Sequence, residues 1–151
     1  MNIFGIIGYE VKCSDINSNK ILHFNSPGGD VYEAIAIANE IKKDSNRIAI
    51  NEGIVAGSAL LPFVVCKDRL LINNAMFRFC EPFILYDKQK KDLYEKDHQS
   101  TDLMSEVSLY YFRIIADVIG LTIEQVKDFC KQEKTVEKEE ALEIGLINFE
   151  E

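Results

Sequence analysis

Two stretches of the chain change from a strand pattern to a helix pattern through a run of small residues, and this repetition limits the folds available to it. The first junction follows the strand-like Ile21-Leu22-His23-Phe24 and consists of the turn Asn25-Ser26-Pro27-Gly28-Gly29-Asp30. The second follows strand-like residues 47–51 and passes through residues 53–59 into an apolar helix. Because strands that alternate with helices usually pair in parallel, the sequence predicts an α/β layered fold with a mainly parallel sheet.

The periodicity of apolar residues predicts the remaining elements. Behind the first turn the pattern predicts a helix that Asp30 caps, with the apolar stripe Val31, Ala34, Ile35, Ala38 and Ile41. A long helix is predicted at about residues 92–119, with the stripe Leu103, Val107, Tyr110, Tyr111, Ile114 and Val118. Short apolar runs predict strands within residues 1–8, 69–72 and 76–79, and a further helix spans residues 122–131. A chain of 151 residues suits one core, so residues 1–151 are expected to form one domain.

Composition excludes several classes of function. The formal net charge is -8 and no basic stripe is present, which argues against nucleic acid as a partner. No apolar run is long enough to cross a membrane and no signal peptide is recognisable, so we expect a cytoplasmic protein without membrane contact. The cysteines are scattered singly and predict reduced thiols, with no disulfide, metal site or cofactor: Cys13, Cys66, Cys80 and Cys130.

The glycines of the two junctions suit the binding of a carbonyl oxygen. Gly28 and Gly29, at the mouth of a helix, allow main-chain N–H groups to approach a ligand closely, and the helix N-terminus adds partial positive charge. A second N–H group would come from Ala56-Gly57-Ser58, where small side chains leave room for a peptide carbonyl. This arrangement outlines an oxyanion hole, although Gly28-Gly29 alone is equally compatible with a simple tight turn.

Three segments in register, residues 25–31, 53–59 and 139–148, resemble the signature segments of ClpP peptidases. The resemblance covers nearly the whole chain and is closest to the phage-type branch, which includes prohead maturation proteases. It implies a ClpP/crotonase-like fold in which the predicted long helix forms a handle. It also implies that the amides of Gly29 and Ser58, next to Gly28, are the oxyanion-hole donors.

The same resemblance places unsuitable residues at the catalytic positions. The pattern puts the serine nucleophile at Gly57 and the histidine base at Cys80, within Phe79-Cys80-Glu81-Pro82. The orienting carboxylate falls near Glu133. Acyl transfer by a serine needs a hydroxyl, a base and a carboxylate in contact, so a degenerate peptidase is the favoured hypothesis.

Two altered mechanisms and a non-hydrolytic function remain open alternatives. Ser58 could serve as the nucleophile through a local bulge, but the two histidines, His23 and His98, lie away from the base position. Cys80 is a nucleophile type that also lacks a histidine, and a small apolar role at a strand end is the simpler interpretation. The third reading is a crotonase-like module that binds an acyl or peptide carbonyl without hydrolysis.

The resemblance also implies partners. In the family the handle helix stacks heptameric rings, so a homo-oligomer is expected, with peptide or unfolded protein as the ligand. An AAA+ ATPase or an active paralogue is the implied protein partner. Because the chain starts at its first strand, we expect it to lack the axial loops that the family uses beside an ATPase, which argues against ATPase docking.

Overall fold

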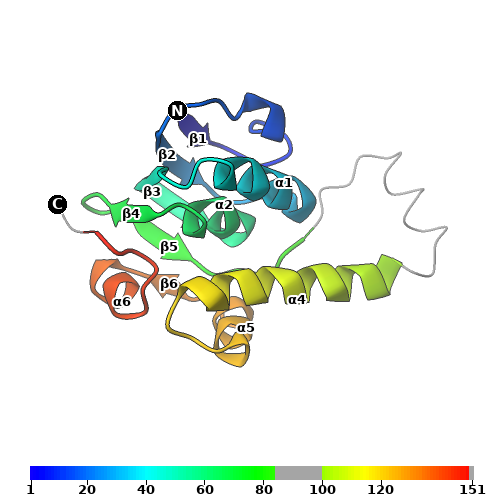
Figure 1. Ribbon diagram of the computed structural model, residues 1–151. Helices are drawn as coiled ribbons and strands as arrows, with labels where there is room; N and C mark the ends of the chain where they lie inside the picture. Colours follow the sequence, from blue (N-terminus) through cyan, green and yellow to red (C-terminus); the bar gives the residue numbers. More distant parts are fainter. Residues whose placement is uncertain (84–99, 150–151) are drawn as a thin grey trace.

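The computed structural model describes residues 1–83 and 100–149 (Figure 1). Its strands and helices, in chain order, are β1 (Asn2–Phe4), β2 (Ile21–Ser26), α1 (Val31–Lys42), β3 (Ile48–Ala56), α2 (Leu60–Val64), β4 (Asp68–Leu71), β5 (Met76–Arg78), α4 (Ser100–Val118), α5 (Ile123–Lys131), β6 (Thr135–Val136) and α6 (Lys138–Glu143). Single 3-10 turns lie at Cys13–Asp15 and Gly57–Ala59. The predicted long helix is α4, which begins at Ser100, while residues 92–99 of that prediction lie outside the described residues.

The sheet is mainly parallel, as predicted from the alternation of strands and helices. Strands β1, β2 and β3 pair in parallel, and β3 then pairs in parallel with β4 along residues 48–51 and with β5 along residues 54–56. Among the strands of the described residues, β6 alone pairs antiparallel, with β5. The α/β class and the flanking helices are therefore confirmed.

Strand β3 changes partners at a buried asparagine. The Asn51 side chain donates a hydrogen bond to the Met76 carbonyl oxygen at 2.8 Å and accepts one from the Gly53 amide at 3.1 Å. These bonds hold the chain where the pairing moves from β4 to β5. The second half of β3 then leads directly into the second glycine junction.

One hydrophobic core joins the sheet to helices α1 and α2, which lie against it in Figure 1, and continues to buried residues of α4 and α5. Helix α1 begins as predicted, because the Asp30 side chain accepts a hydrogen bond from the Glu33 amide at 3.1 Å. Ile37 is fully buried in this helix, whereas Ile35 of the predicted stripe is only partly buried. Phe63 of α2 makes edge-to-face contacts with Phe24 and Phe77, at ring-centroid distances of 5.3 and 5.0 Å. Both junctions are thereby anchored to one packed interior.

A buried arginine joins β4 to the C-terminal turn. Arg69 is 7% exposed, and its guanidinium donates hydrogen bonds to the carbonyl oxygens of Leu146 at 3.0 Å, Cys66 at 2.7 Å and Gly145 at 3.2 Å. Burial lowers the pKa of this guanidinium, while nearby Cys66 and Asp68 act in the opposite direction. The acceptors of the Arg69 guanidinium are thus main-chain carbonyl oxygens. Removing the guanidinium would leave several of these buried oxygens without a donor.

We expect Arg69→Met to lower the free energy of unfolding by about 3 kcal/mol, because it leaves buried carbonyl oxygens unsatisfied. The matched control is Lys67→Met, two residues earlier and exposed, which should change the same quantity by less than about 0.5 kcal/mol. Urea denaturation followed by circular dichroism measures both. Equal stability of the two variants would argue against this role for Arg69.

Candidate active site

Gly28 and Gly29 form a backbone cradle that no larger residue could replace. Both have positive φ angles, +94° and +150°. A Cβ atom on Gly28 would lie 2.7 Å from the Ala56 carbonyl oxygen and 3.1 Å from the Ser58 amide nitrogen. A Cβ atom on Gly29 would lie 2.2 Å from the Ile7 carbonyl oxygen. The two junctions that the sequence singled out therefore touch through their backbones, and glycine is what allows the contact.

Gly57 occupies the corner where β3 gives way to helix. Its φ angle is +53°, in the left-handed region. A Cβ atom built on Gly57 would lie 3.7 Å from Cβ of Cys80 and 3.8 Å from the Pro27 carbonyl oxygen, both ordinary contact distances. A side chain at this position would therefore fit and would meet the side chain at position 80. A strained strand-to-helix corner of this kind is a known way of presenting a nucleophile.

Tyr111 of α4 fixes the corner from behind. Its side chain is fully buried, and its hydroxyl donates a hydrogen bond to the Gly57 carbonyl oxygen at 2.8 Å. Burial raises the pKa of Tyr111 well above its usual value, so the phenol stays protonated and remains a donor. The sequence placed Tyr111 in an apolar stripe and gave no reason to connect it with the glycine junction.

Cys80 lies half-buried against the Gly57 corner. Burial is the largest cause that raises the pKa of its thiol, and Glu133 raises it further, while Arg78 and the Gly57 amide act in the opposite direction. The sulfur is therefore a neutral thiol at neutral pH and makes a poor base and a weak nucleophile.

Glu133 contacts an arginine instead of orienting a base. It lies at the C-terminal end of α5 with φ at +50°, where the Glu133 and Lys134 amides donate to the carbonyl oxygens of Cys130 and Phe129. Its carboxylate accepts a hydrogen bond from Arg78 at 3.1 Å, and both side chains are largely exposed. The Glu133 carboxylate is close enough to Cys80 to raise the pKa of its thiol, but its hydrogen bond goes to Arg78.

Ser58 directs its hydroxyl into the cradle backbone. The side chain is 1% exposed, and Oγ donates a hydrogen bond to the Gly29 carbonyl oxygen at 2.9 Å. That bond ties the second junction to the first. A nucleophilic serine needs its proton to face a base, and here the proton faces a main-chain oxygen.

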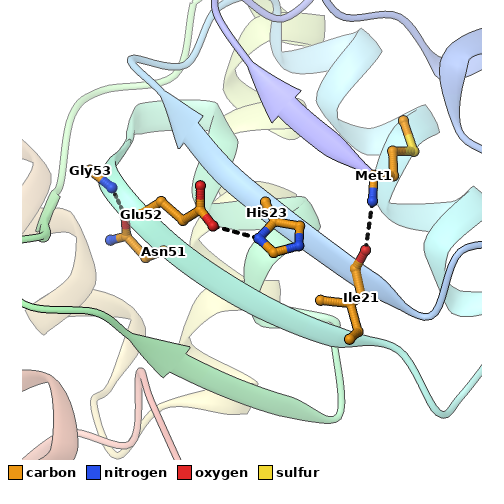
Figure 2. A network of polar contacts seen from close by, with 6 residues as sticks. All are labelled: Met1, Ile21, His23, Asn51, Glu52 and Gly53. Carbon is orange, nitrogen blue, oxygen red and sulfur yellow. Dashed lines mark hydrogen bonds and ion pairs between the residues drawn. The ribbon is translucent and has the colours of Figure 1, made fainter.

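Within residues 1–83 and 100–149, His23 is the one histidine, and it does not lie at the Gly57 corner. His23 on β2 contacts Glu52 on β3, with 2.5 Å between Nδ1 and Oε1, as Figure 2 shows. No atom of His23 lies within 4 Å of a Cβ atom built on Gly57. His98 falls outside the described residues.

The other three cysteines are also neutral thiols. Burial raises the pKa of Cys66 and of Cys130 to about 12, and it also raises that of Cys13. In residues 1–83 and 100–149 no group of acidic, histidine and cysteine side chains is arranged to hold a metal ion. No helix in this part of the chain has the length and apolar character needed to cross a membrane.

Comparisons with known proteins show the family and the fold of the chain. The family model described as Clp protease matches residues 11–149. The chain is 26% identical over 141 residues to ATP-dependent Clp protease proteolytic subunit 2 of Tropheryma whipplei, which covers 91% of this chain and 76% of that protein. A ClpP1 mutant from Listeria monocytogenes has the same fold, with a TM-score of 0.75 and 19% identity, over 97% of this chain and 87% of the other. Because the family match spans nearly the whole sequence, the protein belongs to the Clp protease family.

Proposed function

We propose that this chain is a catalytically impaired member of the Clp protease family that still binds peptide backbone. The observation that carries the proposal is the Gly57 corner, where a side chain would meet Cys80 but no hydroxyl is present. In the cradle beside it, Gly28 lies against the Ser58 backbone, and the Gly29 carbonyl oxygen accepts a hydrogen bond from the Ser58 hydroxyl. Such a site can bind a carbonyl oxygen, but it has no nucleophile to attack the carbonyl carbon.

The chemistry of serine peptidases makes this loss severe. The serine hydroxyl must transfer its proton to a base as it attacks the carbonyl carbon, and a third group holds that base in place. Position 57 has no hydroxyl, position 80 carries a neutral thiol, and Glu133 pairs with Arg78. Hydrogen-bond donors alone supply a small part of the rate enhancement of such enzymes, so little turnover is expected.

We further propose that the protein acts as a ring component or regulatory subunit in the cytoplasm, with a second copy, an active paralogue or an AAA+ ATPase as partner. Support comes from α4, which presents the large apolar side chains Leu109 and Tyr110 at 38% and 39% exposure. A shallow groove of about 470 Å³ lies beside them, lined by Met104, Ser105, Ser108, Leu109, Phe112 and Lys127. Exposed apolar groups along one helix suit burial against a neighbouring subunit.

The activity of the native protein is the simplest test of this proposal. We expect purified protein to cleave fluorescein-labelled unfolded casein no faster than the protein-free buffer does, because neither the hydroxyl nor the base is in place. Release of fluorescent peptides measures the rate, and circular dichroism confirms that the sample is folded. Cleavage above background that disappears in Ser58→Ala would contradict the proposal in favour of a Ser58 mechanism.

A double variant can restore a hydroxyl at position 57 and an imidazole at position 80. We expect Gly57→Ser combined with Cys80→His to raise casein cleavage at least roughly a hundredfold above the native protein, because the new hydroxyl would face an imidazole and general-base catalysis contributes about that factor. The single variants serve as controls and should stay near background. A folded double variant without any gain would show that residues 57 and 80 are not the catalytic positions.

The exposed apolar side chains of α4 allow a test of assembly. We expect the native protein to sediment as an oligomer, and Leu109→Glu with Tyr110→Glu to shift it towards the monomer, because two charges would then be buried at the subunit contact. Sedimentation velocity measures both. The matched control is Lys131→Glu, a change to a charged residue at an exposed position at the end of α5, away from this face of α4. A native monomer would count against the ring role and leave the catalytic proposal to its own test.

A further inference from the structure

The segment that follows Cys80 returns to the start of α1. We call residues Glu81, Pro82 and Phe83 the strap. The Val31 amide donates a hydrogen bond to the Phe83 carbonyl oxygen at 3.0 Å, and Asp30 and Phe83 form a parallel bridge. In Figure 1 the described chain after β5 runs past the start of α1. The strap therefore lies directly beside the glycine cradle.

The direction of the cradle's N–H groups shows which edge the strap covers. The Ile7 amide donates to the Gly28 carbonyl oxygen and the Asp30 amide to the Ile7 carbonyl oxygen, each at 3.0 Å, so this backbone pairs with Ile7 on one side. Successive N–H groups of an extended chain face opposite sides. The amides of Gly29 and Val31 accordingly face the other edge, which is where Phe83 lies.

That edge is the one a bound peptide would need. A peptide whose carbonyl oxygen meets the Gly29 amide would run along this edge as an added strand. The next donor that such a strand would use is the Val31 amide, and the strap already occupies it. We propose that the strap is an autoinhibitory element, which pairs with Val31 and keeps unfolded polypeptide out of the glycine cradle until it is displaced.

The strap is held by contacts that can be exchanged. Its Pro82 side chain is buried, whereas Phe83 leaves 46% of its surface exposed. One main-chain hydrogen bond of ordinary length joins it to α1. A peptide strand would offer Val31 an equivalent acceptor, so opening the strap costs one such bond and the burial of one proline. This inference rests on the proposed peptide-binding function of the cradle.

Three variants separate the strap from the peptide site. Pro82→Gly removes the buried anchor and keeps the Val31 donor. Val31→Pro removes the donor itself, and proline suits this position because Val31 is the first residue of α1, after the extended Asp30. Val31→Ala is the matched control, since it loses apolar contact in the core and keeps the N–H group.

The first measurement reports whether the strap opens. Iodoacetamide modifies the cysteines of the full chain, and peptide mass spectrometry gives the rate at Cys80 relative to that at Cys13, which is also partly buried. We expect Val31→Pro to raise this ratio about fivefold, the effect of losing one hydrogen bond, and Pro82→Gly to raise it by about the same factor, because it loses the burial of the proline side chain. Val31→Ala should leave the ratio unchanged. Cys66 and Cys130 are buried and reveal any global unfolding. An unchanged ratio in both strap variants would overturn the proposal.

The second measurement reports whether the strap inhibits. Fluorescence anisotropy gives the affinity for fluorescein-labelled unfolded casein. Pro82→Gly should bind casein more tightly, because the apparent affinity scales with the fraction of protein whose strap is open. The affinity should rise by the same factor as the rate of Cys80 modification. Val31→Pro should gain nothing, since it opens the strap but lacks the donor. Faster Cys80 modification in Pro82→Gly without tighter binding would overturn the inhibitory role, while the double variant at positions 57 and 80 would still test the proposed function separately.

Discussion

The contact between Gly28 and the backbone of residues 56–58 is the constraint on which the site depends. It joins two junctions that lie far apart in the sequence, and it exists only because Gly28 has no side chain. The Ser58 hydroxyl adds a hydrogen bond to Gly29, and the Tyr111 hydroxyl holds the Gly57 carbonyl oxygen from the opposite side. Helix α4, the proposed surface for assembly, is thereby connected directly to the corner of the site.

The residue at position 57 gives a physical reason for the proposed loss of catalysis. A left-handed backbone costs a residue with a side chain about 1 kcal/mol or more, and enzymes tolerate that cost when the corner must present a nucleophile. Glycine adopts φ of +53° without this penalty. The corner therefore keeps the shape of a nucleophile turn while its strain is relieved, which is consistent with a site that holds a ligand and performs no attack on it.

Local patterns sufficed for the fold, because the strands, the glycine turns and the capped start of α1 are encoded over short stretches. The pairing of Gly57 with Cys80 followed from the family resemblance over residues 53–82, and the structure brings these two positions to contact distance. Three contacts of the site could not be predicted from the sequence. They are the hydrogen bond from Tyr111 to Gly57, the ion pair of Glu133 with Arg78, and the hydrogen bond from Val31 to Phe83. Each joins parts of the chain that are distant in sequence. The first two depend on how α4 and α5 pack, and the third depends on how residues 81–83 return to the start of α1. His23 could be placed on a strand, but its contact with Glu52 required the register between β2 and β3.

The central claim is that no activated hydroxyl exists at the Gly57 corner. Intact-mass spectrometry of the folded native protein after exposure to a fluorophosphonate at neutral pH tests it most directly, because this reagent reacts with serines whose proton is drawn away by a base. The account predicts an unmodified mass. A single adduct that peptide mapping assigns to Ser58 would contradict it.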